Sequence, residues 1–193
     1  MNQETLNFIS SQLEESAKLK LEIAQTHSQR IAQATDVIIN SIENGGKLIT
    51  AGNGGSAADA QHIAAELVVR FQKNRRALPA IALTADSVIL TAAGNDFGYP
   101  DIFSRQLEAL AKPEDVLLVI STSGNSANII KAAQTAKTLE MSSIGLIGYQ
   151  GGMLKDLVDL SIIIPSQNTP RIQEAHITIG HIICELIEKR FTI

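Results

Sequence analysis

The sequence contains no tryptophan, and aromatic residues make up only 4% of its 193 residues. We therefore expect a core of aliphatic side chains and no aromatic platform on which nucleic acid bases could stack. The formal net charge is −4. The stretch that stands out as basic is Lys73-Asn74-Arg75-Arg76. A protein with so little concentrated positive charge is not expected to bind nucleic acid.

Cysteine is also scarce, because Cys184 is the single one in the sequence. An intrachain disulfide is thus excluded, and the apolar neighbours of Cys184 indicate a packed core thiol. No stretch approaches the roughly 20 apolar residues that a membrane-spanning helix needs. The polar and acidic start lacks the basic and apolar regions of a signal peptide. We expect a cytoplasmic protein without a membrane partner.

The remaining composition is that of a globular protein, with 45% hydrophobic and 19% charged residues. The length fits one domain over residues 1–193. Apolar residues at helical spacing over residues 4–43, followed by Gly45-Gly46, predict a long amino-terminal helix, an extension of about residues 1–44.

Beyond this helix, short apolar runs alternate with helical patterns. The runs are continuous rather than alternating, which is typical of parallel strands covered on both faces. They predict a three-layer α/β/α sandwich with a five-stranded parallel sheet, in which ligands bind at the carboxyl ends of the strands. The expected strands cover residues 47–51, 80–83, 116–120, 143–147 and 160–164, and the expected helices cover 57–71, 87–93, 102–110, 126–139, 153–158 and 171–190.

The first strand leads into a glycine turn, Gly52-Asn53-Gly54-Gly55. Glycines let the backbone approach a ligand closely, and the amino terminus of the helix that follows favours an anion. Gly52, Gly54 and Ala57 also fit the loose dinucleotide pattern, but Asp86 comes too late to be its acidic residue. A Walker-type loop is excluded, because no Gly-Lys-Ser/Thr follows. A tight turn without a ligand stays open.

The third strand leads into a hydroxyl loop, residues 121–126, with the sequence Ser-Thr-Ser-Gly-Asn-Ser. Ser126 by itself fits a helix N-cap, and one or two of the hydroxyls fit turn formers. Four hydroxyls beside a glycine at a helix start fit a phosphate monoester better, because hydroxyls and backbone N–H groups both donate. We predict that Ser121, Thr122, Ser123 and Ser126 bind phosphate.

Two helices carry candidates for proton transfer and metal binding. His62 and Glu66 lie four residues apart and share a helix face. A structural His–Glu pair is the alternative. The last helix offers Gln173 and His181 on a largely apolar pattern, where a lone histidine is usually a core residue. Together these four residues suit a zinc-like ion with an open position, or proton transfer without a metal.

The spacing of Gln173 and His181 makes one shared ion awkward. Eight residues correspond to a rise of about 12 Å along a helix. A site assembled between subunits would remove this difficulty.

Farther along, Gly94-Asn95-Asp96 follows a helical pattern at a position that could face the same crevice, where Asn95 and Asp96 suit sugar hydroxyls. A plain polar turn is the alternative.

In order and over nearly the whole chain, these segments resemble the sugar isomerase (SIS) domain, specifically the phosphoheptose isomerases. The segments are residues 51–57, 62–67, 94–96, 120–126 and 171–181. The resemblance implies a flavodoxin-like SIS fold and conversion of sedoheptulose 7-phosphate to D-glycero-D-manno-heptose 7-phosphate through an enediol, for ADP-heptose and lipopolysaccharide core synthesis. It implies Glu66 as the base and His181 as the acid.

The resemblance also implies ligands and assembly. One zinc ion per subunit would be held by His62, Glu66, Gln173 and His181, with no nucleotide cofactor. A homotetramer with sites between subunits is expected. The substrate positions would be Asn53, Gly54, Gly55, Glu66, Asn95, Asp96, Ser121, Thr122, Ser123, Ser126 and Gln173.

Two kinds of non-catalytic protein compete with the isomerase. The replication-initiator-associating proteins share the fold but lack equivalents of Glu66 and His181, which this chain has. A sugar-phosphate sensor would use the hydroxyl loop but has no need of a general base. A nicotinamide-dependent oxidoreductase rests on the glycine turn alone.

Overall fold

The computed structural model describes residues 2–192 and contains one sheet of five parallel strands. Their order is β2-β1-β3-β4-β5, and all neighbouring pairs are parallel. The predicted five-stranded parallel sheet is confirmed. The strands are β1 (Leu48–Gly52), β2 (Ala80–Ala82), β3 (Val116–Ser121), β4 (Ser142–Ile147) and β5 (Leu160–Ile163).

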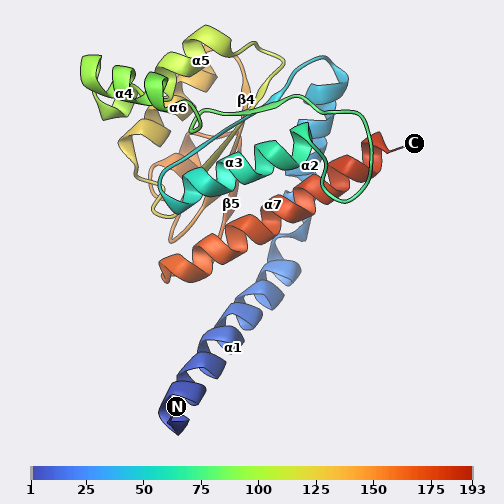
Figure 1. The fold of residues 1–193 in the computed structure, drawn as a ribbon, viewed down its shortest axis with the longest axis vertical. Helices are drawn as coiled ribbons and strands as arrows, with labels where there is room; N and C mark the ends of the chain where they lie inside the picture. Colours follow the sequence, from blue (N-terminus) through green and yellow to red (C-terminus); the bar gives the residue numbers. More distant parts are fainter. Residues whose placement is uncertain (1, 193) are drawn as a thin grey trace.

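Helices cover both faces of the sheet, as predicted for a three-layer sandwich (Figure 1). The helices are α1 (Gln3–Thr26), α2 (Ser28–Glu43), α3 (Gly55–Val68), α4 (Ser87–Asp96), α5 (Ser104–Leu110), α6 (Ala127–Thr138) and α7 (Thr169–Phe191), with short 3-10 helices η1 (Tyr99–Asp101) and η2 (Leu154–Asp156). Within β3, Val116, Leu118 and Ile120 pack into a core with α2, α3 and α7, whereas Leu117 and Val119 pack into a second core with α5 and α6.

The amino-terminal extension is two helices rather than the single one predicted. The break lies at His27, which ends α1 and starts α2 with φ −120° and ψ −5°. The Thr26 and Ser28 hydroxyls donate to the carbonyls of Glu22 and Ala24, and the Thr26 hydroxyl also bonds His27 Nδ1. Such local side-chain bonds compete with helical backbone bonds and bend helices. The spacing of apolar residues, from which one helix was predicted, does not reveal such hydrogen bonds.

The amino-terminal half of α1 projects away from the rest of the molecule (Figure 1). It carries exposed large apolar side chains, namely Leu6, Phe8, Ile9 and Leu13. Among residues 2–192, no helix is both long and apolar enough to cross a membrane.

The strand order has a topological switch point between β1 and β3. The chain leaves β1 towards β2 on one side and leaves β3 towards β4 on the other. Gly52, at the end of β1, lies in register with Ile120 near the end of β3. The glycine turn and the hydroxyl loop therefore begin side by side at the place where α/β sheets of this order bind ligands.

Candidate active site

The glycine turn lets β1 run directly into α3. Gly54 has a φ of +55°, in the left-handed region that favours glycine. A Cβ on Gly52 would lie 2.3 Å from the carbonyl oxygen of Ser56, so the strand end and the helix start approach too closely for any side chain there. A Cβ on Gly55 would lie 2.6 Å from Nε2 of Gln173. The turn thus exposes backbone at the amino terminus of α3.

In the hydroxyl loop, two serine hydroxyls accept hydrogen bonds from the loop backbone, whereas the hydroxyl of Ser126 does not cap the helix that follows. The Ser121 hydroxyl accepts a hydrogen bond from Gly124 N at 3.1 Å, and the Ser123 hydroxyl accepts from Asn125 N at 3.2 Å. Ser126 is the N-cap residue of α6, but its side chain makes no capping bond. Its hydroxyl is therefore free for a ligand at the amino terminus of α6, where the helix dipole favours negative charge.

A second loop, residues 148–153 after β4, interlocks with the hydroxyl loop. Gly124 has a φ of +65°, and a Cβ there would lie 2.1 Å from the carbonyl oxygen of Gly151. Leu154 N donates to Gly124 O, and Met153 N donates to Asn125 Oδ1, both at 3.0 Å. The sequence analysis missed this loop. Its signal was Gly151-Gly152 shortly after a strand.

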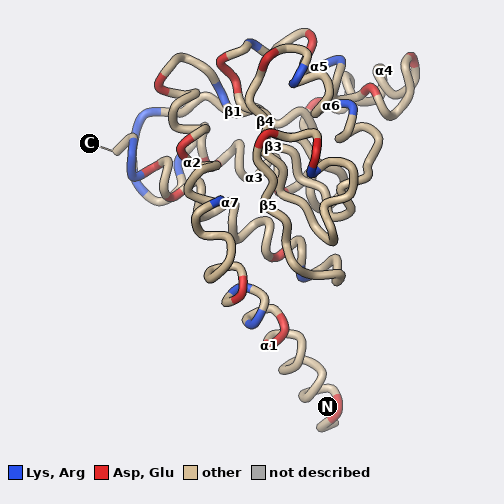
Figure 2. Tube along the Cα trace, turned by 180° about the vertical axis from the view of Figure 1, so that it is seen from behind, with Lys and Arg blue, Asp and Glu red and all other residues tan. Residues whose placement is uncertain are grey.

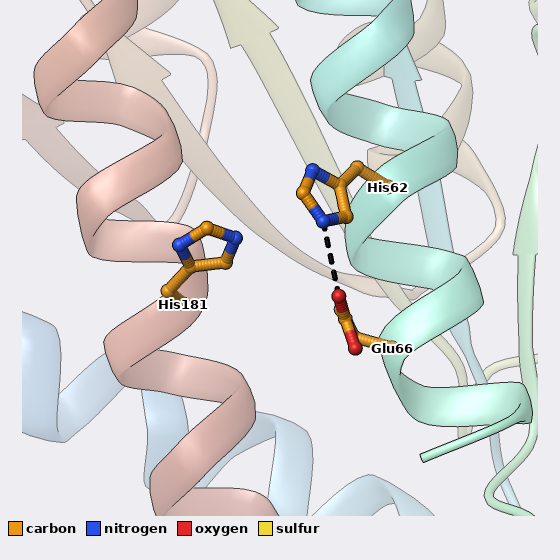
Figure 3. A group of neighbouring side chains, drawn as sticks. All are labelled: His62, Glu66 and His181. Carbon is orange, nitrogen blue, oxygen red and sulfur yellow. Dashed lines mark hydrogen bonds and ion pairs between the residues drawn. The ribbon is translucent and has the colours of Figure 1, made fainter. Parts of the chain in front are cut away.

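His62, Glu66 and His181 form a cluster between α3 and α7 (Figure 3). One ligand atom from each lies within 4.8 Å of the others. His62 Nε2 and Glu66 Oε1 are 3.0 Å apart, and the ring centroids of His62 and His181 are 5.0 Å apart. All three come from the same chain. The structure thus brings three of the four predicted metal ligands together.

Two features hold α3 and α7 close together at this cluster. One is Gly180, the residue before His181. A Cβ on it would lie 2.8 Å from Cδ1 of Ile63, so α7 approaches α3 at a distance that no larger residue allows without a shift.

The other feature is a buried ion pair behind the cluster. Arg75 donates to the carbonyls of Glu66 at 2.7 Å and Leu67 at 2.8 Å. Its Nε lies 3.5 Å from Oε1 of Glu188 on α7, and both side chains are almost completely buried. Arg75 belongs to the basic stretch noted in the sequence. Figure 2 shows basic residues near the carboxyl end of the chain. The side chain of Arg75, by contrast, is buried and holds the end of α3.

The cluster has the chemistry of a metal site. Two imidazoles and a carboxylate are ligands that zinc accepts, and three protein ligands leave a position open for substrate. Such ligands bind at about 2.0–2.2 Å, which places neighbouring donors roughly 3.3–3.6 Å apart in a tetrahedron. The 3.0 Å between His62 and Glu66 is close to that spacing. The residues present therefore fit a bound divalent ion.

Asp59 is a further acidic group that the sequence analysis did not single out. It precedes His62 by one turn of α3. Its Oδ2 is buried and has no hydrogen-bond partner in residues 2–192. Burial raises the pKa of Asp59, and the neighbouring His62 and His181 oppose this rise. The spacing of Asp59, His62 and Glu66 at three and four residues was the signal that could have identified it.

Gln173 makes a different contact from the other predicted metal ligands. It lies on α7 against Gly55 of the glycine turn, about 12 Å along the helix from His181. Within one chain Gln173 therefore adjoins the glycine turn.

Asn95 and Asp96 lie in the last turn of α4 rather than in the segment expected after a helix. Both are exposed, and Asn95 Nδ2 donates to Asp96 Oδ1 at 2.8 Å. The structure does not bring them into hydrogen-bond contact with the other predicted residues of the described chain.

Asp86, weighed above as a possible ribose ligand, has a structural role. Its Oδ1 accepts hydrogen bonds from Val88 N and Ile89 N, and it is the N-cap of α4. One of its two carboxylate oxygens is therefore used to cap the helix.

Comparisons with known proteins agree with this geometry. The sequence model of the SIS domain matches residues 13–148. A phosphoheptose isomerase of Geotalea daltonii is 53% identical over 182 residues, which cover 94% of this chain and 95% of that protein. A phosphoheptose isomerase of Aquifex aeolicus is 51% identical over 175 residues, 91% of this chain and 92% of that protein.

Solved structures give the same result. A phosphoheptose isomerase from Francisella tularensis superposes with a TM-score of 0.93 at 42% identity, covering 98% of this chain and all of that chain (100%). The corresponding protein from Neisseria gonorrhoeae gives a TM-score of 0.90 at 39% identity, covering 96% and 99%.

Proposed function

The chain belongs to the phosphoheptose isomerase family of SIS-domain proteins, and from this we propose that it converts sedoheptulose 7-phosphate to D-glycero-D-manno-heptose 7-phosphate. The product would enter ADP-heptose and lipopolysaccharide core synthesis. The observation that carries the proposal is the meeting of Glu66, His62 and His181 in one cluster. A sugar-phosphate sensor or an initiator-binding protein has no need of this arrangement.

The reaction needs one base and one acid. Glu66 removes the proton from C1 of the ketose, next to the C2 carbonyl, and His181 donates a proton to the carbonyl oxygen. An enediol results. Glu66 then returns its proton to C2 while His181 takes the proton of O1, which leaves an aldehyde at C1 and restores both groups. The side chain of Glu66 is 20% exposed, and so the carboxylate is accessible while partly shielded from water.

Zinc is the ion we propose for the cluster, held by His62, Glu66 and His181. Such an ion would supply Lewis-acid stabilisation of negative charge on the substrate oxygens. A fourth ligand from Gln173 would be supplied by another subunit, since the Gln173 of this chain packs on its own glycine turn.

The two loops are the proposed substrate site. Ser121, Thr122, Ser123 and Ser126 would bind the phosphate with the backbone at the start of α6. The rest of the sugar phosphate would contact Asn53, Gly54, Gly55, Asn95, Asp96 and Gln173. The free hydroxyl of Ser126 supports this assignment.

We propose that residues 1–193 act as one SIS domain within a homotetramer, with sites completed between subunits. Support comes from the exposed apolar residues on the projecting half of α1 and from an apolar groove between α1, α2 and α7. The groove is lined by Ile23, Ile31, Ile179, Ile182 and Leu186, among others. A cytoplasmic location is part of the proposal, and the single buried cysteine is compatible with a reducing compartment.

The test follows aldose formation from sedoheptulose 7-phosphate, with Glu66→Gln as the variant. This substitution keeps the shape but removes the base, and we expect turnover to fall at least about 100-fold. Glu108→Gln is the matched control, because Glu108 is an exposed residue paired with Arg105 on α5. Near-normal turnover in Glu66→Gln would refute the assignment of the base.

The same assay tests the metal. Turnover that a chelator abolishes and zinc restores supports the isomerase and zinc together. Turnover indifferent to the chelator supports the isomerase and refutes zinc. No turnover by folded wild-type protein under any of these conditions refutes the proposed function.

A further inference from the structure

Asn53 in the glycine turn and Asn128 in α6 form a reciprocal amide pair. Asn53 Nδ2 donates to Asn128 Oδ1 at 2.9 Å, and Asn128 Nδ2 donates to Asn53 Oδ1 at 2.8 Å. The residues are 75 positions apart, and Asn128 is buried with only 2% of its surface exposed. The pair links the glycine turn after β1 to the helix that follows the hydroxyl loop after β3. No part of the mechanism above uses Asn128.

A backbone group fixes the orientation of both amides. Ile129 N donates both to Ser126 O and to Asn128 Oδ1, each at 3.0 Å, and a backbone N–H can only donate. The oxygen of Asn128 must therefore face that N–H, which leaves its nitrogen to face Asn53 Oδ1. The amide of Asn53 is then oriented as well, with its oxygen facing Asn128 Nδ2 and its nitrogen facing Asn128 Oδ1. The usual ambiguity between amide oxygen and nitrogen does not arise here.

The acceptor capacity of Asn53 is completely used. Its Oδ1 accepts from Asn128 Nδ2 and also from the Tyr99 hydroxyl at 3.1 Å. A carbonyl oxygen has two lone pairs. One hydrogen of Nδ2 goes to Asn128, so the second N–H of Nδ2 is what the Asn53 side chain can offer to a ligand.

We propose that Asn128 is a positioning residue that makes Asn53 a pure hydrogen-bond donor towards the substrate. The inference rests on the proposed function, which makes Asn53 a substrate contact. The partner of Asn53 is then an oxygen that accepts, such as a phosphate, carbonyl or enediolate oxygen. Asn53 does not accept the proton of a sugar hydroxyl.

Asn128→Asp tests the pair through pH. When the introduced carboxyl is protonated, its O–H replaces the Nδ2–H donor, and its other oxygen still accepts from Ile129 N and Asn53. When it ionises, only acceptors face Asn53 Oδ1, and the Asn53 amide must turn or separate. Burial raises the pKa of such a carboxyl, whereas the donors Ile129 N and Asn53 Nδ2 and the amino terminus of α6 lower it, so the carboxyl is ionised at pH 8.

The measurement is the Kd of sedoheptulose 7-phosphate by calorimetry between about pH 5 and pH 8. It is made in a Glu66→Gln background, where turnover does not interfere. Relative to the same background with Asn128 intact, we expect a loss of affinity of roughly 5- to 100-fold at pH 8, where the carboxyl is ionised, and a smaller loss at any pH at which it is protonated. Asn128→Ala should weaken binding at every pH, without this dependence.

Asn40→Asp is the charge control. Asn40 is exposed on α2, near the amino ends of β3 and β4 and so at the opposite end of the strands from the ligand loops, and the same added charge there should leave Kd unchanged. An affinity of Asn128→Asp at pH 8 that equals that of the background overturns the proposal. Unchanged affinity in Asn128→Ala also overturns the proposal, and this result can be obtained even if Asn128→Asp fails to fold. Absence of turnover by wild-type protein is a separate result, which refutes the isomerase and leaves these binding outcomes decisive.

Discussion

Glu188 offers the strongest test of how α3 and α7 are held together. Its carboxylate accepts hydrogen bonds from three consecutive backbone N–H groups, those of Phe71, Gln72 and Lys73, at 2.9, 2.8 and 2.9 Å. Arg75 lies beside it. Burial opposes ionisation of Glu188, but the three amides and Arg75 outweigh it and hold the pKa below its usual value of 4.5. Glu188→Gln should therefore destabilise the fold.

The magnitude follows from what the amide cannot replace. Glutamine keeps one acceptor oxygen in place of Oε2, which bonds Gln72 and Lys73, and puts an NH2 group where Oε1 accepts from Phe71. A buried N–H without an acceptor costs about 1–3 kcal/mol. Loss of the partner charge of a buried ion pair costs about 3–5 kcal/mol. Arg75 keeps its carbonyl partners, which lowers this second cost. We expect a loss of about 3–5 kcal/mol at pH 7.

The assay is denaturant unfolding followed by circular dichroism, at fixed protein and zinc concentrations because subunit and metal binding shift apparent stability. Glu185→Gln is the control, since the side chain of Glu185 is 43% exposed and pairs with Lys189. It should change stability by less than about 0.5 kcal/mol. The contribution of Glu188 is present above pH 4.5 and is lost as pH falls through the lowered pKa, so the difference between wild type and Glu188→Gln should shrink in acid. A loss below about 1 kcal/mol at pH 7 would refute the reasoning.

Two further predictions concern the hydroxyl loop and a buried histidine. Gly124→Ala combines a φ of +65° with a Cβ only 2.1 Å from Gly151 O, so it should separate the two loops. We expect sugar-phosphate binding, measured by calorimetry, to weaken at least about tenfold. Wild-type affinity in this variant would contradict the interlocked loops. Burial lowers the pKa of His176 from 6.5 to about 4, with the Ile147 carbonyl opposing the shift. At about 1.4 kcal/mol per pKa unit, the free energy of unfolding should fall by about 3 kcal/mol between pH 6.5 and pH 4, an acid slope that His176→Leu should lack in denaturant titrations.

Local patterns in the sequence determined the fold class and much of the candidate site. Continuous apolar runs predicted the five strands, and the glycines and hydroxyls that follow two of them predicted both ligand loops. The four-residue spacing placed His62 and Glu66 on one helix face. Each of these inferences depends on residues close together in the chain, where periodicity and turn chemistry are sufficient.

Contacts between distant segments were decided only by the tertiary structure. The sequence indicates a buried helix around Gly180, but not that Ile63 packs against it and brings His181 to His62. It shows Asn53 in a glycine turn, but not that Asn128 uses its acceptor oxygen. Such pairings depend on which strand ends become neighbours in the sheet. Since the order β2-β1-β3 is a property of packing, no local pattern in the sequence reports it.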